Sequence, residues 1–145
     1  MVVKIEVTTK EIERAIAGYK KRVRGLDNPL RGFGNYYLSE IKKQFRTSTD
    51  PEGNRWANLL ASTLEQKRRQ GYSSSPLVKT GSLENSFSYV IDRRSITIKS
   101  SSPILRFHED GTKKMVARPV IGKRVPQRHK QKLLRLLRTW VKRPR

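Results

Sequence analysis

The chain has 145 residues, and its 33 Lys and Arg against 12 Asp and Glu give a formal net charge of +21. This length suits a single domain, and an apolar fraction of 34% indicates a modest core. The absence of cysteine excludes disulfides and thiolate metal sites and favours an intracellular origin, and no stretch has the apolar length of a signal peptide or a membrane span.

The first part of the chain predicts a strand followed by two helices. Residues 2–7 have strand composition, and Thr8 with Glu11 forms a capping box for a first helix. Asn28 is expected to cap a second helix, with Pro29 at its first position. The apolar residues of this second helix recur at three- and four-residue spacing, as one helical stripe requires. They are Leu30, Phe33, Tyr37, Ile41 and Phe45.

The middle of the chain predicts a turn, a short helix and a loop. The helix is expected over residues 62–70, with Ser62 and Glu65 as a second capping box and Gly71 as its end. The loop that follows leads into a helical turn around Leu83.

The last part of the chain predicts a hairpin, an extended segment and a closing helix. Apolar and polar residues alternate over 86–98, which is typical of a β-hairpin with one buried face. A short helix is expected to begin near Pro103 and end at Gly111. Residues 113–122 have extended character, and 126–142 predict an amphipathic helix.

This order of elements predicts the α+β class, with a small antiparallel β-sheet packed with two or three amphipathic helices. One domain over residues 1–145 accounts for the chain, with a short basic tail from about residue 142.

The positive charge is concentrated near the C-terminus. Residues 111–145 hold thirteen Lys and Arg and no Asp or Glu. Five cations of the closing helix lie off its leucine stripe: Arg128, Lys132, Arg135, Arg138 and Lys142. A solvated helix face is the ordinary explanation of a charge run. A field of one sign is also suited to a partner, because phosphate or carboxylate would neutralise it, so both interpretations stay open.

The residues predict no catalytic site, metal site or cofactor. The two histidines, His108 and His129, lie in different elements without zinc-ligand spacing. The run from His108 to Asp110 contains acid–base groups, but consecutive side chains diverge, which favours a structural role at a helix end. No phosphate-binding loop and no known nucleic-acid module occurs.

Three motifs follow one another along the chain: D-P-x-G-x-x-W at 50–56, L-x-x-T-G-x-L at 77–83 and A-R-P-x-I-G at 117–122. With F-H-x-x-G at 107–111 between the last two, this ordered set resembles the phage virion morphogenesis or tail-completion family, the family of the phage Mu G protein. The resemblance covers about residues 30–141, and Glu109 stands where the family usually has Gln. The residues that carry it are Asp50, Pro51, Gly53, Trp56, Thr80, Gly81, Leu83, His108, Gly111, Arg118 and Pro119.

The resemblance implies a structural protein of a tailed-phage virion, assembled in the host cytoplasm and without enzyme activity. It implies a tail-completion or head–tail neck protein, a connector or tail terminator, that forms a homo-oligomeric ring matching the six-fold tail. The expected neighbours are neck, tail tube or sheath proteins, with possible non-specific contact to genomic DNA and none to a membrane.

Alternatives stay open at two motif residues and for the function. Trp56 suits a core position or an intersubunit contact, and Arg118 suits a salt bridge across a subunit boundary or an ordinary surface position. Thr80 is expected to cap the helical turn. The rival function is a basic nucleic-acid-binding protein without a role in the phage particle, and an enzyme such as a nuclease would need a carboxylate or histidine cluster that the sequence lacks.

Overall fold

The structure is a computed structural model, and it describes residues 4–7, 10, 14 and 25–143. The predicted first helix, with its Thr8–Glu11 capping box, and the last two residues of the basic tail lie largely outside this range.

A three-stranded antiparallel sheet forms one layer of the molecule. Its strands are β1 (Lys4–Val7), β2 (Phe87–Asp92) and β3 (Ser95–Ser100), in the order β1-β3-β2. The hairpin predicted from the alternating pattern is confirmed, and its register pairs Tyr89 with Ile98. Ile96 and Ile98 point into the core and are at most 1% exposed, because alternate residues of a strand face the same side.

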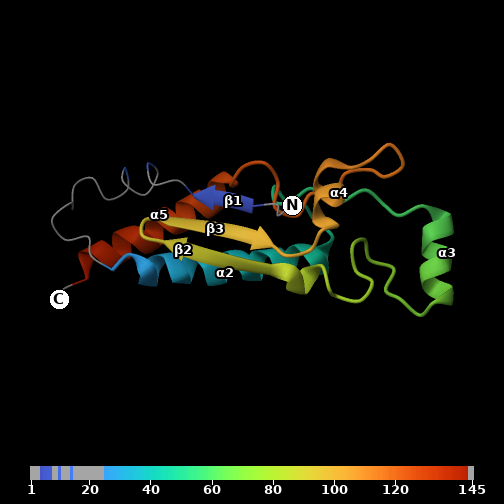
Figure 1. Cartoon of the computed structure of the whole chain (residues 1–145), viewed down its shortest axis with the longest axis horizontal. Helices are drawn as coiled ribbons and strands as arrows, with labels where there is room; N and C mark the ends of the chain where they lie inside the picture. The colour runs from blue at the N-terminus through green and yellow to red at the C-terminus, as the bar shows by residue number, and fades with distance from the viewer. Residues whose placement is uncertain (1–3, 8–9, 11–13, 15–24, 144–145) are drawn as a thin grey trace.

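Two long helices form the other layer. Helix α2 (Asp27–Thr47) packs against β2 and β3, and α5 (Gln127–Lys142) runs along α2, as Figure 1 shows. The predicted apolar stripe of α2 is buried throughout, and so are Leu133, Leu137 and Val141 of α5. The α+β class and the antiparallel sheet are therefore confirmed.

A glycine in α2 allows the sheet to approach closely. A Cβ atom placed on Gly34 would lie 2.6 Å from Cδ1 of the Tyr89 ring, which is too close for any other residue type. Gly32, two positions earlier, has nothing nearer than Leu136 Cδ1 at 3.9 Å.

Three short elements complete the described part of the chain. They are α3 (Ala61–Arg69), the 3-10 turn η2 (Glu84–Ser86) and α4 (Leu105–Asp110). The helical turn predicted around Leu83 and the helix end at Gly111 are confirmed. Gly111 has a φ of +72°, and a Cβ there would lie 2.9 Å from the backbone nitrogen of Ala117.

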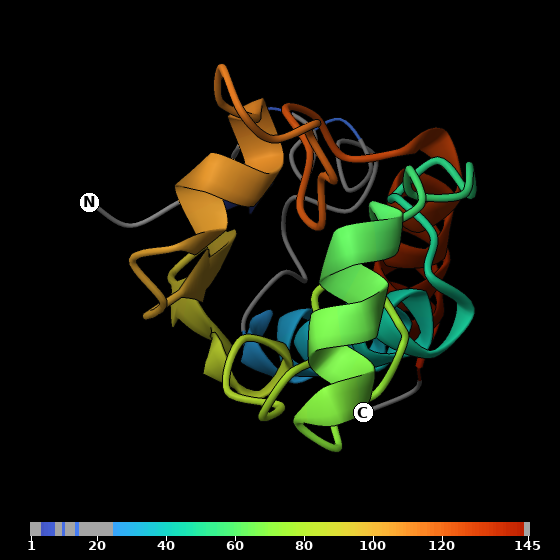
Figure 2. The same ribbon diagram turned by 90° about the vertical axis from the view of Figure 1, so that its right-hand side faces the viewer.

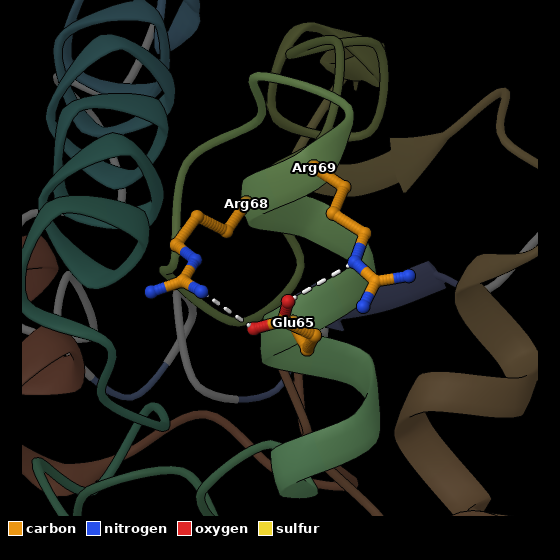
Figure 3. A network of polar contacts seen from close by, with 3 residues as sticks. All are labelled: Glu65, Arg68 and Arg69. Carbon is orange, nitrogen blue, oxygen red and sulfur yellow. Dashed lines mark hydrogen bonds and ion pairs between the residues drawn. The ribbon is translucent and has the colours of Figure 1, made fainter.

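The caps predicted for α2 and α3 are wrong. Helix α2 begins at Asp27, with buried Leu26 rather than Asn28 in the capping position, and no side chain caps it. Helix α3 likewise begins after Leu60 without a side-chain cap. Its Glu65 carboxylate instead pairs within the helix with two arginines, Arg68 and Arg69, at 2.9 and 3.0 Å (Figure 3).

The extended segment predicted over 113–122 forms no strand. A single bridge joins Thr112 to Met115, and the rest is irregular. The backbone N–H groups of Val120 to Gly122 donate to the carboxylate of Glu109, so they are not available to a sheet. Within the described residues no helix is long and apolar enough to cross a membrane.

Candidate functional site

The D-P-x-G-x-x-W motif is a tight turn that reverses the chain after α2. The Asp50 side chain accepts the backbone N–H of Asn54 at 2.8 Å, and its carbonyl accepts that of Gly53 at 3.0 Å. Gly53 has a φ of +92°, a conformation that glycine adopts without strain. The turn returns the chain so that the Trp56 N–H donates to Ser48 O at 2.8 Å.

Trp56 is a core residue. Its side chain is 5% exposed and meets the Phe45 ring edge-on, with centroids 5.6 Å apart. Its indole Nε1–H donates to the carbonyl of Pro119 at 2.8 Å. This bond gives the buried indole N–H, the one polar group of the side chain, a partner. The first motif is thereby joined to the third, 63 residues later in the chain.

Arg118 clamps the chain just beyond Trp56. Its guanidinium donates to the carbonyls of Ala57 and Asn58, from Nε at 2.7 Å and from Nη2 at 2.9 Å. The residue is 7% exposed, so the expectation of an ordinary surface arginine is wrong. Both hydrogen bonds of the Arg118 guanidinium are to carbonyls of its own chain, and the described structure gives Arg118 no acidic partner.

Glu109 organises the A-R-P-x-I-G segment. Its Oε1 accepts the N–H groups of Val120 and Ile121 at 2.8 and 2.7 Å, and its Oε2 accepts that of Gly122 at 2.9 Å. Sequence reasoning missed this residue as an organiser. The sequence offered one signal: the three residues after Pro119 carry N–H groups that need acceptors, and an acidic residue lies about ten positions earlier.

His108 lies beside this network and has no catalytic partner within the described chain. Its backbone carbonyl accepts the Arg118 N–H at 2.7 Å, while its buried Nδ1 has no hydrogen-bond partner in the described structure. Burial, with a smaller effect of Arg118, lowers the pKa of His108 and favours the neutral ring. No group of three or more His, Asp or Glu suited to a metal occurs among the described residues.

The second motif and α4 border a cleft of about 400 Å³ between α3 and α4. Five of the predicted motif residues line it: Thr80, Gly81, Leu83, His108 and Arg118. Asp50, Pro51 and Trp56 lie outside the cleft, near the end of α2, so the motifs form two clusters joined through Arg118 and Pro119. Thr80 Oγ1 lies 3.4 Å from the Ser82 nitrogen, at the start of the loop that leads to η2.

The wall of the cleft opposite α4 comes from α3 and from the loop after it, which includes the second motif. The Lys67 ammonium donates to the carbonyls of Ser75 and Val78 in this loop, both at 2.7 Å. Burial, with a smaller effect of Lys79, lowers the pKa of Lys67.

The five cations predicted on the closing helix recur at three- and four-residue spacing, so they share the face of α5 away from its buried residues. Arg135, Arg138 and Lys142 border a shallow groove of about 340 Å³. Lys132 instead lies over the ring of Tyr36, with Nζ 5.4 Å from its centroid. Arg128 is exposed at the beginning of α5.

The buried polar contacts join segments of one chain into a scaffold, and the described residues hold no set of groups arranged for a reaction. The chain belongs to the phage virion morphogenesis family, which matches residues 7–139. That family suggests a role in the structure or assembly of a phage virion and is not known for enzymes. Neither the curated proteins nor the solved structures give a match.

Proposed function

We propose that the chain is a ring-forming subunit of the phage tail or head–tail neck, a tail-completion protein, connector or tail terminator. The observation that carries this is the family match over residues 7–139, together with motif residues that serve the scaffold rather than a reaction. The subunits form a homo-oligomer that follows the six-fold tail, and the chain is not an enzyme.

The two ends of the molecule offer different surfaces to neighbouring proteins of the virion. Figure 1 places α3 and the C-terminal end of α5 at opposite ends of the long axis. The first end carries exposed apolar side chains and the second a cationic groove, so the two ends differ in chemistry.

The charge supports an anionic neighbour for the groove on α5. A formal charge of +21 on one chain is self-repelling, and acidic neck, tail tube or sheath proteins, or the genomic DNA, would neutralise it. We propose Arg135, Arg138 and Lys142 as the contact residues, because they line one groove.

The experiment is electron microscopy of particles made with and without the chain, with the subunit located in the density. We expect unjoined heads and tails, or tails of abnormal length, when the chain is absent, and a ring at the tail end or neck when it is present. Normal infectious particles without the chain would contradict the proposal.

The rival function, a free nucleic-acid-binding protein, is favoured by the net charge alone. Binding of the purified chain to duplex DNA at several salt concentrations separates the two. Arg138→Gln removes one phosphate contact, so the slope of log binding constant against log salt concentration should fall in magnitude by roughly one. Nanomolar binding by an isolated monomer at physiological salt would favour the rival.

A further inference from the structure

Exposed apolar side chains gather at one end of the molecule. Six large apolar residues are exposed among the described residues, and one of them, Val90, lies on β2. The other five belong to α3, α4 or the segments next to them: Leu60 at 72%, Leu64 at 38%, Ile104 at 46%, Phe107 at 39% and Val116 at 63%. Of these five, Ile104 also lines the cleft between α3 and α4, and exposed apolar surface beside a cleft is typical of binding sites.

Helix α3 has no packing partner in the described subunit. None of its nine residues is buried, and Figure 2 shows it standing in front of the rest of the molecule in the end-on view. The ion pairs of Glu65 lie within the helix, and the bonds from Lys67 join it to the loop that follows. A helix this short is marginal in water without tertiary packing, so a covering partner would stabilise it.

The cleft behind α3 combines an apolar lining with positive charge. Leu77, Leu83 and Ile104 contribute apolar surface, and Lys67 and Arg118 contribute charge. None of the described residues that line the cleft is Asp or Glu. The two cations donate to backbone carbonyls, so their full charges have no acidic neighbour in the lining.

The loop at the cleft carries backbone strain. Leu77 lines the cleft and has a φ of +60°, in the left-handed region that branched side chains avoid. Such a conformation costs roughly 1–2 kcal/mol and is most often found at functional sites.

We propose that α3, α4 and the cleft between them are a docking site for an acidic segment of another virion protein. An apolar side chain of that segment enters the cleft, and its carboxylates lie against Lys67 and Lys79. A second copy of the chain is the poorer occupant, because it brings a further net charge of +21. DNA is also poorer, since phosphates leave the exposed leucines uncovered.

The proposal rests on the proposed function only in making the occupant a virion protein, and its first test is independent of it. The probe is a fluorescent twelve-residue peptide in which Leu and Phe alternate with Glu, and anisotropy gives its affinity for the full chain. Leu64→Glu is compared with Val90→Glu. This control also replaces an exposed apolar side chain and makes the same change of charge, but it lies away from the cleft. Neither change reaches the core, and melting temperatures verify folding.

We expect Leu64→Glu to weaken peptide binding at least about tenfold and Val90→Glu less than about twofold. Ile104→Glu, on the other side of the cleft, should repeat the loss. Equal weakening in Leu64→Glu and Val90→Glu, or no binding by the unaltered chain, would overturn the proposal. Displacement of the peptide by duplex DNA that itself depends on Leu64 would also overturn it.

The second test is incorporation of the same variants into particles. Val90→Glu should be incorporated like the unaltered chain, and Leu64→Glu should be depleted. Normal incorporation of Leu64→Glu would count against the docking site. Absence of the unaltered chain from particles would instead refute the proposed function, while the peptide result would still decide the binding site.

Discussion

Replacing Gly34 by alanine should destabilise the protein, although alanine is the better helix former. Alanine in a helix interior is worth about 1 kcal/mol over glycine. The new Cβ would lie 2.6–2.7 Å from Cγ, Cδ1 and Cε1 of Tyr89, and overpacking of this kind costs roughly 1–3 kcal/mol. Displacing the ring also breaks the 3.0 Å bond from the Tyr89 hydroxyl to Asn35 Oδ1, which costs about 1 kcal/mol.

The net expectation is a loss of roughly 1–3 kcal/mol in the free energy of unfolding. At this chain length each kcal/mol lowers the melting temperature by roughly 2–4 °C. The assay is urea unfolding followed by Trp fluorescence, with thermal unfolding alongside. Gly32→Ala is the matched control in the same helix. Its nearest atom is an ordinary 3.9 Å away, so it should stabilise by up to about 1 kcal/mol.

A double-mutant cycle with Tyr89→Ala identifies the cause. Once the ring is gone, Gly34→Ala should become stabilising, like Gly32→Ala. If Gly34→Ala already stabilises the unaltered protein, the close approach of α2 to β2 is wrong.

Three further predictions concern the buried network and the core. Burial, with a smaller effect of Arg128, lowers the pKa of His129 from 6.5 to about 4. The unfolded chain therefore binds its proton first, and stability should fall by roughly 2 kcal/mol from pH 7.5 to pH 5. Urea unfolding at the two pH values measures this, and His129→Gln should reduce the fall, leaving the share of His108, whose pKa burial also lowers. Trp56→Ala should cost roughly 3–5 kcal/mol, whereas an unchanged melting temperature with lost assembly would place Trp56 in an interface. Glu109→Gln keeps one oxygen acceptor but presents an amide NH₂ to Gly122, so it should cost roughly 1–2 kcal/mol in urea unfolding. The exposed change Asp110→Asn should be neutral, and equal effects of the two would contradict the role of the Glu109 carboxylate.

The parts of the fold that follow from periodicity could be predicted from the sequence. The stripe of α2, the hairpin and the amphipathic α5 each depend on local spacing that buries one face. The helix caps could not be predicted in the same way. Packing of Leu26 sets where α2 begins, and the Glu65 carboxylate finds two arginines nearer than a free backbone amide.

The candidate site was only partly predictable for a related reason. The motif residues were found in the sequence, but their partners lie far away along the chain. Trp56 donates to a carbonyl 63 residues later, and Arg118 returns to carbonyls about 60 residues earlier. Glu109 was taken for a helix-end residue, because the amides that it holds become adjacent only after the chain has folded.

The position of the Arg118 clamp has a mechanical consequence. The guanidinium fixes the chain at Ala57 and Asn58, immediately before α3 begins at Ala61, and the adjoining Pro119 is held by Trp56. A force on α3 would therefore load the Arg118 hydrogen bonds before it reaches the hydrophobic interior.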